Sequence, residues 1–197
     1  TGLRITGNSV QVIDPPYIPE DRIPFNRNGS PATGQPRLGG TLSVAVDPRT
    51  NQSATVYLAW ADQPPQSMLT IHVRRSSDRG VTWSPADLFT AANDTNAALA
   101  INNAGVVGLL YQQLAGTGAT RRWVTHFRQT SDGVNWADLV LSTAPANVPT
   151  KTFDPYLGDY DHLVAVGRDF YGIFSANNTP DQANFPNGVV YQRNADF

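Results

Sequence analysis

The sequence contains no cysteine among its 197 residues, which excludes disulfides and thiolate metal sites and leaves the redox compartment open. Its charged residues are few and uneven, because Glu20 is the only glutamate and Lys151 the only lysine, against thirteen arginines. The net charge of -2 and the lack of a basic run give no sign of a nucleic-acid partner. No apolar stretch reaches the roughly 18 residues of a membrane-spanning helix. Neither nucleic acid nor a membrane is therefore expected as a partner.

Short runs of β-branched and aromatic residues recur along the chain, separated by glycine, proline, asparagine and aspartate. No amphipathic helix interrupts them, so the pattern predicts an all-β fold. An isolated strand is expected at residues 9–13, before a long proline-rich connection. The other predicted strands form three sets: residues 41–46, 55–61, 69–75 and 86–90; residues 97–101, 105–112, 122–129 and 138–141; and residues 163–166, 170–175 and 189–192.

One phrase occurs twice, as Ser-Asp-Arg-Gly-Val-Thr-Trp ending at Trp83 and as Ser-Asp-Gly-Val-Asn-Trp ending at Trp136. Similarity at a period of about 50 residues is typical of a radially repeated fold. The first two strand sets align around the phrase, residues 57–60 with 109–112 and residues 72–78 with 126–132. Four antiparallel strands in each repeat predict the blade of a β-propeller.

The strand sets predict three blades, at residues 41–92, 93–145 and 146–197, after an N-terminal segment at residues 1–40. The third set lacks a fourth strand, and the strand at residues 9–13 is expected to supply it, because a bare edge favours aggregation. Three blades are fewer than the usual four to eight or so of a closed propeller. The chain is therefore expected to be a partial propeller. A second copy would complete a six-bladed ring, or the remainder of a longer chain would complete it.

The segment from Val73 to Trp83 resembles the Asp box of the bacterial neuraminidase repeat (BNR, sialidase-like) superfamily, and the second copy is one residue shorter. Arg22-Ile23-Pro24 resembles the Arg-Ile-Pro motif of sialidases, and Gly158-Asp159-Tyr160 resembles an element of bacterial BNR proteins. The resemblance covers about residues 40–195 and implies that the Asp-box turns face away from the active side. The residues to which it gives a structural role are Ser76, Asp78, Gly80, Trp83, Asp132, Gly133 and Trp136.

The resemblance also implies which residues sialidase catalysis would require. A sialidase holds its substrate carboxylate with three arginines, protonates the leaving oxygen with an aspartate, and attacks with a tyrosine that a glutamate activates. The only glutamate is Glu20, in the proline-rich connection, so a Tyr–Glu pair is not expected. Asp62 is the nearest match to the acid/base aspartate, and non-catalytic BNR blades also carry an aspartate there.

Alternation of the strands places a second group of loops on the side opposite the Asp boxes, where a small ligand or glycan would bind. Asn93–Asn96 and Gln112–Gln113 fall on this side, and the predicted ligand-binding residues are Arg22, Arg37, Asp62, Tyr156, Asp159, Tyr160 and His162. Each also has a plainer interpretation. Asp159 and Asp161 would cap a turn, and His162 would pack at a strand start. Asp159, Asp161 and His162 have no spacing diagnostic of a metal, so no metal or cofactor is expected.

The leading functional hypothesis is a catalytically incomplete sialidase-like module that binds glycan or another partner opposite the Asp boxes. One alternative is an exo-glycosidase of sialidase type, completed by another chain or by a missing segment. Another is a purely structural interaction domain. A secreted or extracytoplasmic location is expected from the Asn-, Thr- and Ser-rich composition and from a start without methionine, which a removed signal peptide or a cut from a longer protein would explain.

Overall fold

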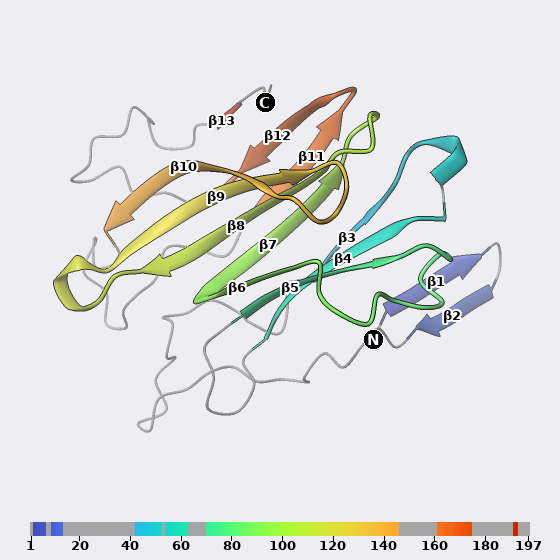
Figure 1. Ribbon diagram of the computed structural model, residues 1–197, viewed down its shortest axis with the longest axis horizontal. Coiled ribbons are helices and arrows are strands. Elements are labelled where there is room, and N and C mark those ends of the chain that lie inside the picture. Colours follow the sequence, from blue (N-terminus) through green and yellow to red (C-terminus); the bar gives the residue numbers. More distant parts are fainter. Residues whose placement is uncertain are drawn as a thin grey trace.

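The computed structural model describes residues 42–52, 54–62, 70–145 and 161–174, together with three further strands near the chain ends. These residues form antiparallel β-sheets and two short 3-10 turns, η2 (Thr50–Gln52) and η3 (Gly118–Thr120), so the predicted all-β class with four-stranded sheets is confirmed (Figure 1). Among the described residues no helix is long and apolar enough to cross a membrane.

Three sheets contain strands that are consecutive in the sequence. The first sheet is β3 (Leu42–Val46), β4 (Val56–Asp62), β5 (Thr70–Ser76) and β6 (Phe89–Ala92). The second is β7 (Asp94–Ile101), β8 (Val107–Ala115), β9 (Arg122–Thr130) and β10 (Ala137–Pro145). The third is β11 (His162–Val166), β12 (Asp169–Ile173) and β13 (Tyr191–Gln192). Each predicted strand is present, with its ends shifted by a few residues.

The second sheet is covered on both faces by the other two (Figure 1). Leu99, Leu109 and Tyr111 face the first sheet, in a core that includes Tyr57 and Phe89. The alternate residues of the second sheet face the third sheet in a separate core, which contains Ala98, Leu110, Phe127, Leu163 and Phe170. Burial on both faces explains why residues 97–101 of β7 and 107–111 of β8 form continuous apolar runs rather than alternating ones.

Each sheet has a leading face, turned toward the preceding sheet, and a trailing face, turned toward the next. Leu99 lies on the leading face of the second sheet and Leu163 on that of the third, because each packs in the core shared with the sheet before it. In β3, Ala45 packs in the first core. Alternation therefore puts Val44 and Val46 on the leading face of the first sheet.

Consecutive sheets are also joined turn to turn. The Asn102 side-chain amide donates a 2.8 Å hydrogen bond to the carbonyl of Arg168, and the amide of Asn103 donates one to the carbonyl of Gly167, also at 2.8 Å. The Asn102 Oδ1 atom also accepts from the backbone amides of Ala104 and Val106. The second and third sheets are thus connected by polar contacts as well as by their core.

Two expectations are corrected by the register. Trp60 pairs with His72 and Tyr111 pairs with His126, so Trp60 corresponds to Tyr111 and the predicted alignment of residues 57–60 with 109–112 is one residue out. The strand at residues 9–13 is also reassigned. It is β2 (Ser9–Ile13) and pairs with β1 (Gly2–Thr6), instead of completing the third sheet.

The reason for the second correction is local. The pair Thr6 and Ser9 closes the β1–β2 register and leaves Gly-Asn as the two-residue link. Gly-Asn between two alternating β runs is a recognised signal for a two-residue hairpin. A partner two residues away also costs far less loop-closure entropy than one near the opposite end of the chain.

Candidate functional site

The first Asp-box turn is closed by hydrogen bonds to one carboxylate. Asp78 accepts from the amide of Thr82 at 2.8 Å, from the Thr82 hydroxyl at 2.6 Å and from the Ser76 hydroxyl at 2.7 Å. Ser76 Oγ in turn accepts from the amide of Gly80 at 2.7 Å. The Thr82 and Ser76 hydrogen bonds lower the pKa of Asp78 to about 2. Arg79 and Gly80 both have positive φ, at 64° and 84°, which makes glycine the natural residue at the second position.

The second Asp-box turn is one residue shorter and is also closed by hydrogen bonds to its aspartate. Asp132 accepts from the amides of Val134 and Asn135, both at 2.8 Å, and from the Asn135 side-chain amide at 2.7 Å. The Thr130 hydroxyl donates at 2.9 Å, the role that Ser76 has in the first turn. The backbone amides of Asn135 and Val134, followed by these side chains, lower the pKa of Asp132. Both carboxylates are therefore ionised and engaged within their own turns.

The two Asp-box tryptophans differ in their contacts. Trp136 donates from Nε1 to the carbonyl of Leu88 in the preceding sheet at 3.2 Å, and its ring lies 5.5 Å from that of Phe89. The Nε1 of Trp83 is buried and has no hydrogen-bond partner among the described residues. The second Asp box is thus connected to the first sheet through its tryptophan.

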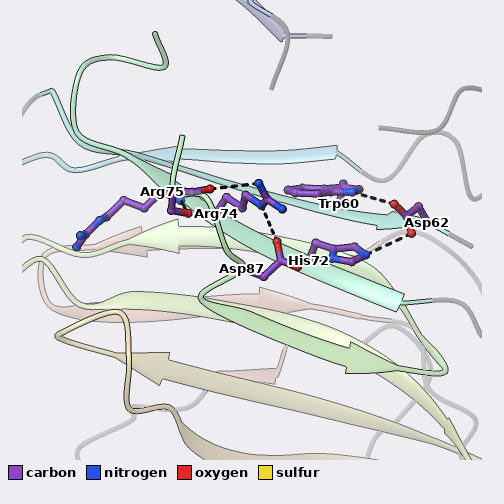
Figure 2. A network of polar contacts seen from close by, with 7 residues as sticks. Trp60, Asp62, His72, Arg74, Arg75 and Asp87 are labelled. Atoms are coloured by element: carbon purple, nitrogen blue, oxygen red, sulfur yellow. Dashed lines mark hydrogen bonds and ion pairs between the residues drawn. The ribbon is translucent and has the colours of Figure 1, made fainter. Parts of the chain in front are cut away.

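Asp62 lies at the far end of the first sheet from its Asp box, since it pairs with Thr70 whereas Val56 pairs with Ser76. It takes part in the network of Figure 2, where it accepts from Trp60 Nε1 at 3.3 Å and meets His72 Nε2 at 3.3 Å. The other ring nitrogen of His72, Nδ1, lies 2.8 Å from Asp87. Because an ionised carboxylate only accepts, both contacts are hydrogen bonds only when the imidazole carries two protons.

Arg74 and the Trp60 ring complete the contacts of the network. Arg74 donates from Nε to Asp87 at 2.7 Å, and the ring of His72 stacks on that of Trp60 with centroids 5.0 Å apart. Burial opposes ionisation of Asp87, but hydrogen bonds from Arg74 and His72 outweigh it and hold its pKa below the ordinary value. The network is a partly buried ion-pair cluster that ends at Asp62.

The same cluster recurs in the second sheet. His126 Nδ1 lies 3.1 Å from Asp138, Arg128 pairs with Asp138 at 3.3 Å, and the Tyr111 ring stacks on His126 at 5.0 Å. The Arg128 guanidinium also lies 4.9 Å from the centre of the Phe89 ring in the first sheet. Sequence reasoning did not select these residues. The signal was present, because His-x-Arg before each Asp box and Ala-Asp-Leu after it are repeated in both copies.

A group of buried polar residues lies at the Asp62 end of the second sheet. Asp94, Thr95, Asn96, Gln112 and Thr125 are all almost completely inaccessible to solvent. Asn96 donates from Nδ2 to Gln112 Oε1 at 2.9 Å, and its backbone has a positive φ of 60°. Of the predicted ligand loops, residues 94–96 and Gln112 are therefore placed together in the interior of the molecule, whereas Asn93 is exposed and Gln113 half-buried.

Asp94 is the exceptional member of this group. Burial raises its pKa to about 7. The Gln113 side chain, opposite Asp94 in the register, opposes this rise in pKa, but no described residue makes a hydrogen bond of ordinary length and angle to either Asp94 carboxylate oxygen. The nearby charges oppose one another, because Arg128 lowers the pKa of Asp94 and Asp138 raises it.

The remaining predicted residues are only partly covered by the structure. His162 is exposed at the start of β11, opposite Ile173 and at the other end from the Gly167 turn, so it lies at the same end of the stack as Asp62. The other predicted ligand-binding residues lie outside the described residues: Arg22, Arg37, Tyr156, Asp159 and Tyr160. In the described part of the chain no three histidine or acidic side chains are grouped so as to hold a metal ion.

A hollow of about 550 Å³ lies on the other side, beside the second Asp-box turn. Val106, Thr130, Val134 and Trp136 contribute to its lining, and none of the lining residues that the structure describes is ionisable. No family model and no curated protein matches this sequence. Function must therefore be inferred from the site geometry and from the residue motifs.

Proposed function

We propose that this chain is part of a sialidase-like β-propeller, in which the stacked sheets are blades, and that it binds a glycan at the sheet ends opposite the Asp boxes without hydrolysing it. The observation that carries the proposal is the separation of roles between the two ends. The Asp78 and Asp132 carboxylates accept hydrogen bonds within their own turns. The opposite end presents Asp62 and the exposed His162.

The lack of hydrolysis follows from the chemistry that the residues offer. Asp62 is tied to His72 and Trp60, and the sequence supplies a single glutamate to activate a tyrosine. The Asp62 carboxylate and the His162 imidazole lie at the same end of the first and third sheets and suit hydrogen bonding to sugar hydroxyls, because a carboxylate accepts and an imidazole donates. The tyrosine of the described polar cluster, Tyr111, is fully buried and stacked on His126, so it is not placed to attack a sugar.

The test measures binding and turnover separately. The purified chain is applied to a glycan array, and Asp62→Asn and His162→Ala are compared with Asp169→Asn, which changes a carboxylate at the Asp-box end of the third sheet. We expect the first two variants to lose binding and the third to retain it. Binding to no glycan, or equal binding by all three variants, would overturn the proposal.

A fluorogenic sialoside distinguishes the enzyme from the binding module. The proposal expects no turnover by the wild-type chain at any pH. Turnover that disappears in Asp62→Asn would refute the non-catalytic assignment and favour an exo-glycosidase, with Asp62 as its acid/base.

A further inference from the structure

The leading face of the first sheet, which also holds the polar cluster around His72, has an apolar stripe along β3 that stays exposed. Val44 is 63% exposed, whereas Leu99 and Leu163, which occupy the leading face on the corresponding strands of the next two sheets, are each 5% exposed. The two leucines are buried because a preceding sheet packs on them. Leu42 and Val46 extend the open stripe along β3, at 49% and 55% exposed.

The open part of this face is confined to β3. Leu58 and Trp60, on the next strand of the same face, are already buried. Within the stack, the first strand of each sheet packs beside the first strand of the next sheet, since β7 lies beside both β3 and β11. The open strand, β3, is the first strand of its sheet. A partner would therefore extend a contact that already occurs twice within the chain.

The other end of the stack has the complementary surface. Leu163 and Phe170 of the third sheet pack on the second sheet, so Val164 and Ile173 lie on its trailing face. These two residues are 40% and 50% exposed. In the first sheet the trailing face, which contains Ala45 and Ala59, is buried against the second sheet. The first sheet thus exposes a leading face and the third sheet exposes a trailing face, and these are the two kinds of face that pack together inside the stack.

The two open faces cannot meet within one copy, because the second sheet separates them. We propose that two copies of this chain assemble head to tail, each leading β3 stripe covered by the trailing face of the other copy's third sheet. The pair contains two identical contacts and leaves neither face exposed, as a closed two-fold assembly requires. The three stacked sheets of each copy make six in the pair.

The internal contact predicts which residues meet. The amide of Leu99 donates a 2.8 Å hydrogen bond to Ser43 Oγ on β3. If the contact between two copies repeats this packing of β7 on β3, Val44 of one copy lies against β11 of the other, near Val164. Both residues are β-branched and apolar, so a charge at either position would be buried without a partner.

The experiment is a sedimentation measurement on the full chain at micromolar concentration. We expect twice the chain mass for the wild type. Val44→Asp and Val164→Arg should each weaken the dimer by roughly tenfold or more, because each buries an unpaired charge in the contact. Val134→Asp is the matched control, since Val134 is 72% exposed on the second Asp-box turn and should leave the dimer unchanged.

The decisive measurement is sedimentation of an equimolar mixture of Val44→Asp and Val164→Arg. The mixed pair has one contact with opposite charges and one contact of wild-type sequence, so the dimer should return. A monomeric wild type, or a dimer insensitive to both substitutions, would overturn the proposal. Unchanged circular dichroism of each variant excludes misfolding as the cause. Glycan binding is measured separately through Asp62→Asn, because His162 lies on the same trailing face as Val164.

Discussion

The buried carboxyl of Asp94 makes the stability of this chain dependent on pH in an unusual direction. Its pKa of about 7 in the folded protein lies above the ordinary aspartate value of 3.8, because burial disfavours the charged form. The folded state therefore keeps a proton that the unfolded chain releases between about pH 4 and pH 7. Stability from this group is fully present below pH 4, declines through that window, and stays constant above pH 7.

The size of the effect follows from the shift. About three pKa units, at 1.36 kcal/mol each, amount to about 4 kcal/mol between pH 4 and pH 8. Asp94→Asn keeps the shape of the side chain and removes its ionisation. The variant should resemble the wild type at pH 4 and exceed its free energy of unfolding by up to about 4 kcal/mol at pH 8.

Urea unfolding of both proteins at several values between pH 2 and pH 8.5 measures this difference. Asp78→Asn is the control with the opposite sign. The pKa of Asp78 is lowered to about 2, so that substitution should destabilise the protein at neutral pH and lose its effect as the pH falls toward 2. A difference between wild type and Asp94→Asn that does not change with pH would refute the burial argument.

Three further substitutions test the packing between sheets. Gly108→Ala would put a methyl group 2.8 Å from a ring carbon of Phe170 and should cost about 1–3 kcal/mol in chemical unfolding, whereas Gly172→Ala, with ordinary contacts, should be nearly neutral. Trp136→Phe removes the hydrogen bond to Leu88 and should lower the melting temperature more than Trp83→Phe, whose indole N–H has no partner among the described residues. Asn102→Ala removes three hydrogen bonds at the turn between the second and third sheets and should cost about 2–3 kcal/mol in the same unfolding assay, which equal stability would contradict.

The strands and the Asp-box turns could be predicted because their causes are local. Strands follow from alternation of apolar and polar residues, and the turns follow from glycine positions and an aspartate that accepts within its own turn. Each of these signals involves only residues close together in the sequence. The His72 and His126 clusters were missed although their residues repeat in the sequence, since the contacts depend on which residues lie opposite across two strand pairs. A shift of one residue in aligning β4 with β8 was enough to separate Trp60 from Tyr111, its true counterpart.

Longer-range choices were harder for the same reason. The strand Ser9–Ile13 has a pattern that suits any sheet edge, and only the structure shows that it pairs with Gly2–Thr6. The burial of Asp94 was also hidden, because an aspartate in an Asn- and Thr-rich segment reads as a loop residue exposed to solvent. Its burial depends on tertiary packing that the local sequence does not specify.

The second sheet depends on both of its neighbours, and this dependence has a consequence for how the molecule loses its structure. Neither apolar face of β8 is satisfied by the second sheet alone. Opening the first or the third sheet would expose a whole core at once, so partial unfolding at either end carries a large penalty. The three sheets should therefore behave as one cooperative unit, with the middle strands the last to give up their hydrogen bonds.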